Sequence, residues 1–351
     1  MADVAIVGFA QAPNVRATLG TTNGVEMLVP IFAEVFERTG LSKKDIGFWC
    51  SGSSDYLAGR AFSFIAAVDA IGAFPPIHES HVEMDAAWAL YEAWLKIRMG
   101  EVDTALVYGF GKSSAGHLRR VLALQLDPYL VAPLWPDSVS IAGIQARLGI
   151  DAGLWSEKDL AEVAARSRAD AVRNPHAQLS GHVEVTDLLD APFVADPLRA
   201  HDIAPITDGA AAIVLASAER ARDLVERPAV IAGIEHRVDS PVLGARDLTR
   251  SPSTEAAGRA IGVDGVEVAE LHAPFTHQEL ILCEALGLDD QVRINPSGGV
   301  LVGNPMFAAG LARIGEAATQ ILTGQARKTL AHATSGPALQ QNLVCVMETR
   351  D

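Results

Sequence analysis

Short runs rich in Val, Ile and Ala alternate with longer helical patterns along the chain, and this order of elements occurs twice. The alternation is typical of strands that are buried on both faces of a sheet and covered by helices. It therefore predicts an α/β fold built in layers. Because the second half repeats the plan of the first, we expect a duplicated fold, although the two halves share little direct sequence identity.

The first half contains five predicted strands with helices between them. The helices are predicted at about 24–39, 60–72, 84–99 and 156–173, and the last opens with an N-cap serine and an acid three positions later. The strands are Val4–Phe9, Ile46–Cys50, Ile77–His81, Thr104–Tyr108 and Ala210–Ala216.

The second half repeats this plan with helices near 252–261, 276–286 and 305–322. Its predicted strands are Ala229–Ile234, Val266–Leu271, Arg293–Asn295, Leu330–Ala333 and Asn342–Met347.

The segment 112–200 interrupts the alternation of strands and helices, because it is rich in proline and has only one convincing helix. We expect it to lie over one end of the sheets, where loops commonly carry ligand sites. The predicted organisation is therefore one half from residues 1–111 and 201–222, an inserted loop domain at 112–200, and a second half at 223–351.

Charge excludes nucleic acid as an expected partner. The chain carries 28 Lys and Arg against 43 Asp and Glu, which gives a formal net charge of −15. No basic run is longer than Arg119-Arg120, whereas affinity for nucleic acid comes largely from clustered Lys and Arg.

The sequence also predicts a soluble, cytoplasmic protein with no membrane span. Cys50, Cys283 and Cys345 have no CxxC spacing, which fits a reducing compartment, and we expect them as buried small hydrophobic residues. The N-terminus has an acid where a signal peptide needs a base. The most apolar stretch, Gly298–Ala312, is interrupted by glycine, asparagine and proline.

Four ordered motifs resemble those of thiolases of the sterol-carrier-protein type, which include lipid-transfer proteins and acetyl-CoA acetyltransferases. The resemblance covers essentially the whole chain, and the motifs lie in the expected strand and helix context. They are Asn174–Gln178, Asp208–Leu215, Glu270–Phe275, and Asn295–Gly299 continuing through Gly303–Pro305.

This resemblance implies a specific architecture. Two five-stranded α/β halves would be related by a pseudo-dyad in αβαβα layers, with a loop domain inserted in the first half that holds coenzyme A. It also implies a tight dimer, and a helix Ala86–Ile97 left alone would expose Trp88, Leu90 and Trp94.

The reactive positions of thiolases differ in this chain. The nucleophilic cysteine of a thiolase opens the helix before a Gly-x-x-Asp strand, which here reads Gly100–Asp103. Counting back from Gly109 without gaps places Glu83 at the cysteine position, with Asp85 two residues later. A carboxylate there can act as a base, but it cannot form an acyl-enzyme.

Three further thiolase groups are replaced as well. The Gly-His-Pro motif reads Gly303–Pro305, so Asn304 stands in place of the base. The His-Asp-Cys-Phe motif reads His272–Phe275, which keeps the histidine and loses the cysteine. The C-terminal loop Ala331–Pro337 has no cysteine either, so the resemblance predicts that this chain does not catalyse thiolysis.

The candidate catalytic residues are therefore His272, Asn304, Glu83 and Asp85, each with two interpretations. His272 is either a ligand for water or a thioester carbonyl, or an inherited structural hydrogen-bonding group. Asn304 could donate to an enolate oxygen, but we favour it as the cap of a helix that begins at Pro305. Glu83 and Asp85 could act as general bases, but helix capping is the favoured interpretation.

The candidate cofactor-binding residues are Ser297, Gly298, Gly299 and His332, at a cleft for coenzyme A or an acyl-CoA. The glycines are expected to allow close backbone approach rather than to hold phosphate. No covalently bound cofactor and no metal is expected, since His332, His277 and Glu279 do not have the spacing of a metal site. Arginines of the inserted segment are weak candidates for the phosphates: Arg147, Arg166, Arg168 and Arg173.

Two functions remain open. The chain is either an acyl-CoA-binding subunit of lipid or steroid side-chain metabolism, working with a thiolase-like paralogue or a small OB-fold, zinc-ribbon protein, or an active aldol-type lyase or acyltransferase that forms no acyl-enzyme. Thiolase-like aldol lyases of steroid breakdown resemble this chain but rely on tyrosines late in the chain. This sequence has no tyrosine late in the chain, which counts against a direct transfer of that mechanism. Its tyrosines are Tyr56, Tyr91, Tyr108 and Tyr129.

Overall fold

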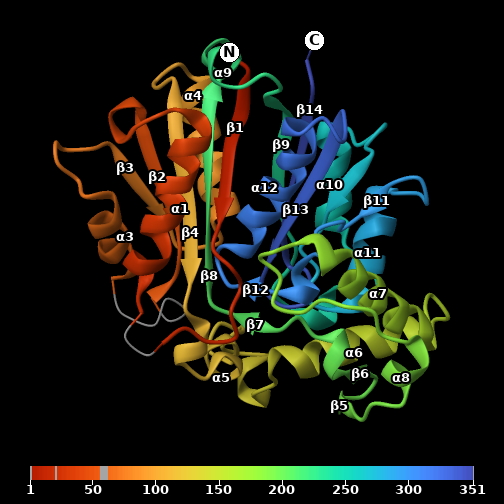
Figure 1. Cartoon of the computed structure of the whole chain (residues 1–351). Helices are drawn as coiled ribbons and strands as arrows, with labels where there is room; N and C mark the ends of the chain where they lie inside the picture. The colour runs from red at the N-terminus through yellow and green to blue at the C-terminus, as the bar shows by residue number, and fades with distance from the viewer. Residues whose placement is uncertain (1, 20–21, 56–61, 351) are drawn as a thin grey trace.

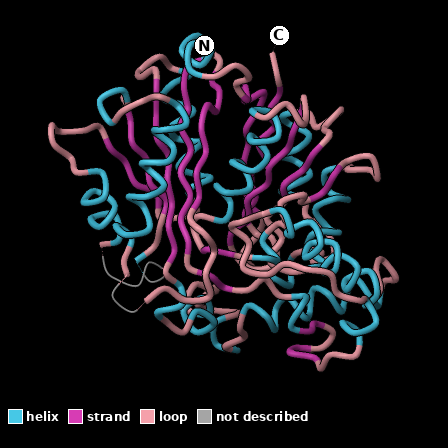
Figure 2. Tube along the Cα trace, in the orientation of Figure 1, coloured by secondary structure: helices cyan, strands magenta, loops and turns pink. Residues whose placement is uncertain are grey.

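The computed structural model describes residues 2–19, 22–55 and 62–350. Ten strands form one mixed sheet, in the order β11-β10-β13-β14-β9-β1-β8-β4-β2-β3 (Figure 1). All ten predicted strands lie in this sheet, and the predicted α/β fold with a duplicated order is confirmed. Figure 2 shows the strands running side by side through the middle of the molecule, with helices on their faces.

The sheet consists of two five-stranded halves with the same arrangement. In each half two antiparallel pairings are followed by two parallel ones. The first half contains β1 (Val4–Gln11), β8 (Gly209–Ser217), β4 (Thr104–Gly111), β2 (Phe48–Gly52) and β3 (Glu79–Val82). The second contains β9 (Ala229–Val238), β14 (Gln341–Glu348), β13 (Lys328–Ser335), β10 (Val268–Glu270) and β11 (Arg293–Ile294).

The halves meet where β1 pairs with β9, antiparallel, through Ala5 with Val230 and Ile6 with Ala229. β1 also pairs along most of its length with β8. The seam between the halves is therefore short compared with the pairings inside each half.

Helices form three layers around the two halves. α1 (Gly24–Thr39) and α3 (Ser63–Ile71) share a hydrophobic cluster with the outer face of the first half. α10 (Pro252–Ile261) and α11 (Thr276–Leu286) do the same for the second half. Between the halves, α4 (Ala86–Arg98) and α12 (Ala309–Leu322) pack against strands of both. The αβαβα layering that the resemblance implies is confirmed.

The central position of α4 corrects one expectation. Trp88 and Leu90 are buried inside the chain, and Trp94 packs against the same cluster with the Arg98 guanidinium over its ring. These side chains are therefore covered without a second subunit, and the argument for a dimer from their exposure is wrong.

The inserted segment lies beneath both halves in the view of Figure 1. The prediction of only one helix there is wrong, because α5 (Leu118–Ala123), α6 (Ser138–Asp151) and α8 (Val185–Leu189) accompany α7 (Glu157–Asp170). α6 contains two glycines, which lower helix propensity. Gly149 is required by packing, since a Cβ there would lie 1.8 Å from Cζ2 of Trp155.

Smaller elements connect these layers. α9 (Ala218–Leu224) follows β8, while β5 (Phe193–Ala195) pairs with β6 (Leu198–Arg199) in the inserted segment. β7 (Ile206–Thr207) pairs in parallel with β12 (Asn304–Pro305).

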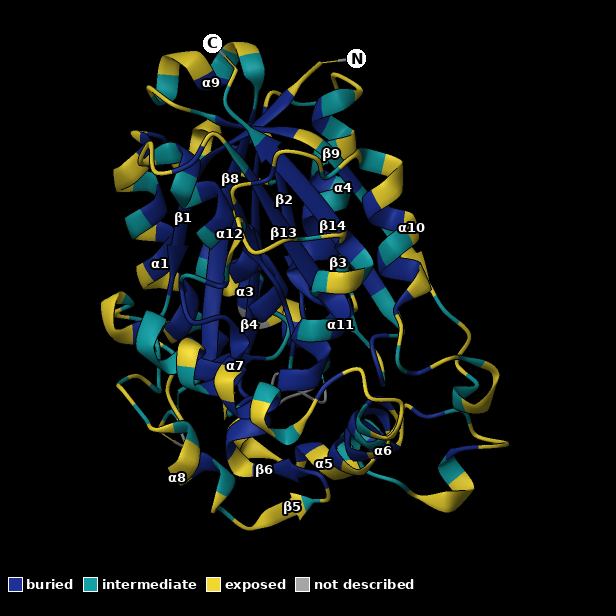
Figure 3. Cartoon of the chain, turned by 90° about the vertical axis from the view of Figure 1, so that its right-hand side faces the viewer, coloured by how far each residue is buried: buried dark blue, intermediate teal, exposed yellow. Residues whose placement is uncertain are grey.

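Several predicted boundaries move by a few residues. The strand predicted at Ile77–His81 is β3, two residues later at its start, and the helix predicted from residue 60 is α3, although residues 60 and 61 lie outside the described part of the chain. In Figure 3 the strands are mostly buried, whereas exposed residues gather on the outer helices and the inserted segment. Within the described residues, no helix is long and apolar enough to cross a membrane.

Candidate functional site

The N-termini of the two central helices meet at one point, and Asp85 joins them. Its carboxylate accepts hydrogen bonds from the backbone N–H groups of Ala87 (2.9 Å), Gly310 (2.9 Å) and Leu311 (3.0 Å). The N–H of Ala86 donates to the carbonyl of Phe307 at 2.9 Å. Because helix N-termini carry partial positive charge, one carboxylate here stabilises both helices.

Asp85 is a helix cap, in agreement with the favoured interpretation of this residue. Burial raises the pKa of its carboxyl group, and the three backbone hydrogen bonds oppose that rise. A carboxylate that already accepts three N–H groups has little capacity left to take a proton from a ligand.

Glu83 lies elsewhere. Its side chain is 63% exposed, and its carboxylate lies 3.7 Å from Nε2 of His81 on β3. The structure therefore does not bring Glu83 into the interior with Asp85.

Two buried histidines lie on neighbouring strands: His272 follows the end of β10, and His332 lies within β13. The His272 N–H donates to the carbonyl of His332 at 3.2 Å, and the Thr334 N–H donates to Nδ1 of His272 at 3.4 Å. Since Nδ1 accepts, the neutral ring carries its hydrogen on Nε2. The pKa of His272 is lowered to about 3. Burial is the largest cause, and the nearby His332 and Arg313 lower the pKa further. His272 is therefore neutral at physiological pH.

Asn304 lies beside this imidazole. Its carboxamide raises the pKa of His272 against the larger effect of burial. Asn304 is 5% exposed, and its Oδ1 has no hydrogen-bond partner among the described residues. A buried acceptor without a partner is uncommon in folded proteins and is a place where a ligand or water group fits.

The structure overturns the capping interpretation of Asn304. The residue belongs to β12 and pairs with Ile206, while α12 begins only at Ala309. Phe307 lies between them with a left-handed φ of 65°, which is uncommon for a bulky residue. Asp85 caps α12 instead, because it accepts from the N–H groups of Gly310 and Leu311. The Asn304 side chain therefore does not cap this helix.

A chain of hydrogen bonds fixes His332. Nε2 of His332 lies 3.0 Å from Oδ1 of Asn342, and Nδ2 of Asn342 donates to Oγ of Ser253 at 2.7 Å. The Ser253 hydroxyl in turn donates to Asp239 at 2.5 Å. These bonds orient the Asn342 amide so that its oxygen faces His332. Burial lowers the pKa of His332 to about 4. Sequence reasoning missed Asn342 and Ser253, although a polar residue at the start of a buried strand was a visible signal.

The turn Ser297–Gly299 is occupied by contacts inside the protein. The Ser297 hydroxyl donates to Glu270 at 2.7 Å, and the carbonyl of Gly298 accepts from Ser167 of α7. Gly298 has a φ of 92°, and a Cβ there would lie 2.8 Å from that of Ala171. The glycines allow close backbone approach, as expected, and they dock the inserted segment on the second half.

A buried ionic network lies beneath this turn. Nη1 of Arg313 lies 2.5 Å from the Glu270 carboxylate, and Gln11 donates to Glu316 nearby. Burial raises the pKa of Glu270 to about 7, with Arg313 opposing the rise and Glu316 adding to it. Two carboxylates around one guanidinium favour retention of one proton.

The arginines considered for phosphate binding are partly engaged within the chain. Arg166 forms an ion pair with Glu279, which also accepts from Asn295 at 2.6 Å. Arg147 pairs with Asp196.

The three cysteines and the tyrosines are the remaining reactive side chains. Burial raises the pKa of all three thiols, to about 12 for Cys283 and Cys345, so none is a thiolate at neutral pH. Tyr108 is fully buried and Tyr129 is 85% exposed, while Tyr56 lies outside the described residues. Within the described ranges, no group of three or more His, Cys, Asp and Glu could hold a metal ion.

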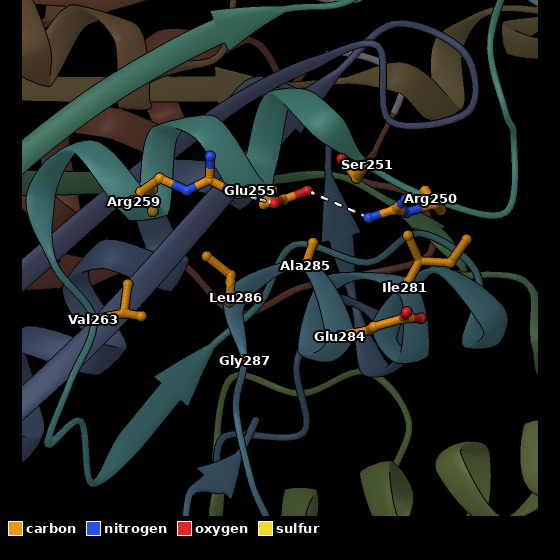
Figure 4. A pocket seen from close by; sticks show the side chains of 11 residues that line it. Arg250, Ser251, Glu255, Arg259, Val263, Ile281, Glu284, Ala285, Leu286 and Gly287 are labelled. Carbon is orange, nitrogen blue, oxygen red and sulfur yellow. Dashed lines mark hydrogen bonds and ion pairs between the residues drawn. The ribbon is translucent and has the colours of Figure 1, made fainter.

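A groove of about 320 Å³ lies between α10 and α11 on the outer face of the second half. Figure 4 shows Glu255 between Arg250 and Arg259, with Glu284 and Leu286 on the opposite wall. Neither His272 nor Asn304 lines it, so it is separate from the histidine cluster.

The chain has relatives among curated proteins, although no family model matches it. It is 30% identical over 198 residues to an acetyl-CoA acetyltransferase of Methanothermobacter thermautotrophicus, covering 49% of this chain and 51% of that protein. It is 42% identical over 144 residues to the 17-hydroxy-3-oxo-4-pregnene-20-carboxyl-CoA lyase of Mycobacterium tuberculosis, covering 38% of this chain and 37% of that one. The match thus spans about half the length of the acetyltransferase, or less for the lyase.

Solved structures match over nearly the whole chain. An Ltp2-ChsH2(DUF35) aldolase has a TM-score of 0.80 at 19% identity, with 98% of each chain covered. The acetyl-CoA acetyltransferase of Bacillus anthracis has a TM-score of 0.79 at 17% identity, with 100% of this chain and 99% of that chain covered. The thiolase fold and the resemblance predicted from the motifs are confirmed.

Proposed function

We propose that this chain binds an acyl-CoA of lipid or steroid side-chain metabolism and acts as a subunit of a heteromeric, thiolase-like complex without cysteine-based chemistry. The observation that carries the proposal is the buried, neutral His272 beside the buried carboxamide of Asn304, within a thiolase fold.

The pair suits recognition of a thioester rather than attack on it. A neutral imidazole and a carboxamide both donate hydrogen bonds, and such donors stabilise a carbonyl or enolate oxygen in a water-excluded site. Neither group forms an acyl-enzyme, and Asn304 cannot act as a base. His332 accepts the His272 N–H at its backbone carbonyl, and this contact would help to hold His272 in place.

The substrate class and the partner rest on the relatives. The curated lyase is named for a steroid carboxyl-CoA, which supports a bulky acyl-CoA as ligand. The aldolase of known structure is named for two components, Ltp2 and ChsH2(DUF35), and this supports a heteromer. The partner in this proposal is a thiolase-like paralogue or a small OB-fold, zinc-ribbon protein, and a second copy of this chain is an alternative.

An aldol-type lyase is the second candidate, favoured by the local 42% identity to the steroid carboxyl-CoA lyase. In such a cleavage a base removes the β-hydroxyl proton, the Cα–Cβ bond breaks, and the electron pair moves to the thioester as an enolate that is then protonated. His272 and Asn304 would stabilise the enolate. We rank this second because Asp85 is occupied as a cap and Glu83 lies at the surface, so the base would come from another group.

Calorimetry with acetyl-CoA, a long-chain acyl-CoA and a steroid acyl-CoA tests the proposal, with the protein alone and with the partner. We expect His272→Ala and Asn304→Ala each to weaken binding about tenfold, the effect of one lost hydrogen bond. Arg259→Gln, at an exposed position of α10, is the control and should change nothing. Absence of binding at millimolar ligand, with and without the partner, would leave a purely architectural subunit.

Product analysis of the same mixtures separates the two candidates. Release of a shortened acyl-CoA and a carbonyl product from a β-hydroxyacyl-CoA would favour the lyase, whereas binding without turnover would favour the subunit.

A further inference from the structure

Asn304 lies in a short segment, residues 303–308, that has little regular structure of its own. Only Asn304 and Pro305 belong to a strand, β12, and this strand pairs with β7 over two residue pairs. The Asn304 N–H donates to the carbonyl of Pro205 at 3.1 Å. Because so short a pairing is marginal by itself, the position of the segment also depends on what lies on its other side.

The end of β4 lies on that other side, and it meets the segment with two glycines. A Cβ built on Gly111 would lie 2.2 Å from the carbonyl oxygen of Met306, and one built on Gly109 would lie 2.4 Å from that of Phe307. A real Cβ does not approach a heavy atom so closely, and a backbone oxygen cannot turn away as the end of a flexible side chain can. Any side chain at either position would therefore displace the segment.

Gly109 also brings the start of α4 to the same place. Its Cβ would lie 2.8 Å from the Cβ of Ala86, whose N–H donates to the carbonyl of Phe307 at 2.9 Å. Asp85, the preceding residue, accepts from two N–H groups at the start of α12. The segment is thus held by the two central helices at its C-terminal end and lies against β4 along its backbone.

We propose that Gly109 and Gly111 are positioning residues that set the place of the Asn304 carboxamide beside His272. The two carbonyls against β4 lie two and three residues after Asn304. Since each residue has only two soft backbone dihedrals, a shift of these carbonyls moves Asn304 as well. A carboxamide stabilises a thioester or enolate oxygen only at hydrogen-bond distance. This inference rests on the proposed function and adds two residues that act through Asn304.

Gly111→Ala is the main variant. Gly111 is the last residue of β4 and Met306 is half-buried, so the segment can move outward while the fold is kept. Gly109→Ala is harsher, because its Cβ would also meet Ala86 of α4. We expect Gly111→Ala to weaken acyl-CoA binding about tenfold in calorimetry, as for loss of the Asn304 hydrogen bond.

A double-variant cycle separates positioning from a general structural effect. If Gly111 acts through Asn304, the double variant Gly111→Ala, Asn304→Ala should bind as weakly as Asn304→Ala alone, within about twofold. If the two residues act independently, their losses multiply to about a hundredfold, and this result overturns the proposal.

A second readout needs no ligand. In protein that is isotope-labelled at asparagine nitrogen, the NMR signal of the Asn304 carboxamide is the one lost in Asn304→Ala, and we expect it to shift in Gly111→Ala. Two controls should leave this signal and acyl-CoA binding unchanged. A Cβ at Gly116→Ala would meet nothing within 4 Å, whereas Gly233→Ala clashes with Ile261 of α10 and destabilises the second half instead.

The failure of this inference and that of the proposed function are distinguishable. An unshifted Asn304 signal in Gly111→Ala, in protein that urea unfolding shows to be folded, overturns the positioning role whether or not the chain binds acyl-CoA. A shifted signal in a chain that binds no acyl-CoA supports the positioning role and overturns the proposed function instead. If Gly111→Ala does not fold while Gly233→Ala does, Gly111 serves the fold as a whole and the positioning role is likewise overturned.

Discussion

Replacing Asp85 should damage stability more than any surface change, because one carboxylate caps two helices. In Asp85→Ala the N–H groups of Ala87, Gly310 and Leu311 lose their acceptor in the interior. A buried donor left unpaired costs about 1 to 3 kcal/mol, and removal of a helix cap costs about 0.5 to 2 kcal/mol. We therefore expect the free energy of unfolding to fall by about 3 to 6 kcal/mol.

Asp85→Asn provides the matched comparison. Its Oδ1 can still accept from Ala87 and Leu311, and only the oxygen that accepts from Gly310 becomes an N–H₂ group. We expect this variant to lose about 1 to 2 kcal/mol, because one of three bonds is removed and no charge remains buried. Urea unfolding measures both values, with the slope checked for a common unfolded state. A loss below about 1 kcal/mol in Asp85→Ala, or equal losses in the two variants, would refute the capping argument.

Three other predictions follow from the same interior. Burial raises the pKa of Glu270 from 4.5 to about 7, so the folded protein binds a proton that the unfolded chain has released, and this contribution to stability should fall as pH rises through that interval. Urea midpoints across pH should show the slope, and Glu270→Gln should flatten it. Gly298→Ala, at a φ of 92°, should destabilise the protein by about 1 to 3 kcal/mol and make the inserted segment more sensitive to limited proteolysis; an unchanged digestion pattern would contradict the docking role of this turn. The chain should not cleave 3-ketoacyl-CoA with coenzyme A, since all three thiols are buried and protonated; a turnover of ~1 s⁻¹ or more would show this inference wrong.

The strands were predictable because their signal is local. Runs such as those of β1 and β8 are apolar on both faces, and this pattern identifies a buried strand without knowledge of its neighbours. The helices predicted near 252–261 and 276–286 are α10 and α11, and both have the predicted bounds. α6 was missed because the prolines of the segment 112–200 favoured loops there, and its Gly149 is explained only by the Trp155 ring packed on it.

The candidate site was less predictable because its contacts are distant in the sequence. Asp85 receives N–H groups from residues 225 and 226 positions away, so an acid at a helix start could not be assigned to one role from spacing alone. Asn304 before a proline resembled a helix start, but tertiary pairing with Ile206 places it in a short strand. His272 and His332 were both identified, while the Asn342 and Ser253 side chains that hold His332 follow only from the fold.

In the central helix layer, each half buries apolar side chains against the other half. One hydrophobic cluster contains Phe48 of the first half and Met347 of the second, with Leu90 of α4 and Ile314 of α12 between them. The direct seam of the sheet is only two residue pairs long, so the shared cluster provides most of the cohesion. A fragment comprising residues 223–351 would present an open apolar face, and it would regain a native structure only by complementation with the missing half. The two repeats are therefore one cooperative unit, and a destabilising change in either should lower the melting of both together.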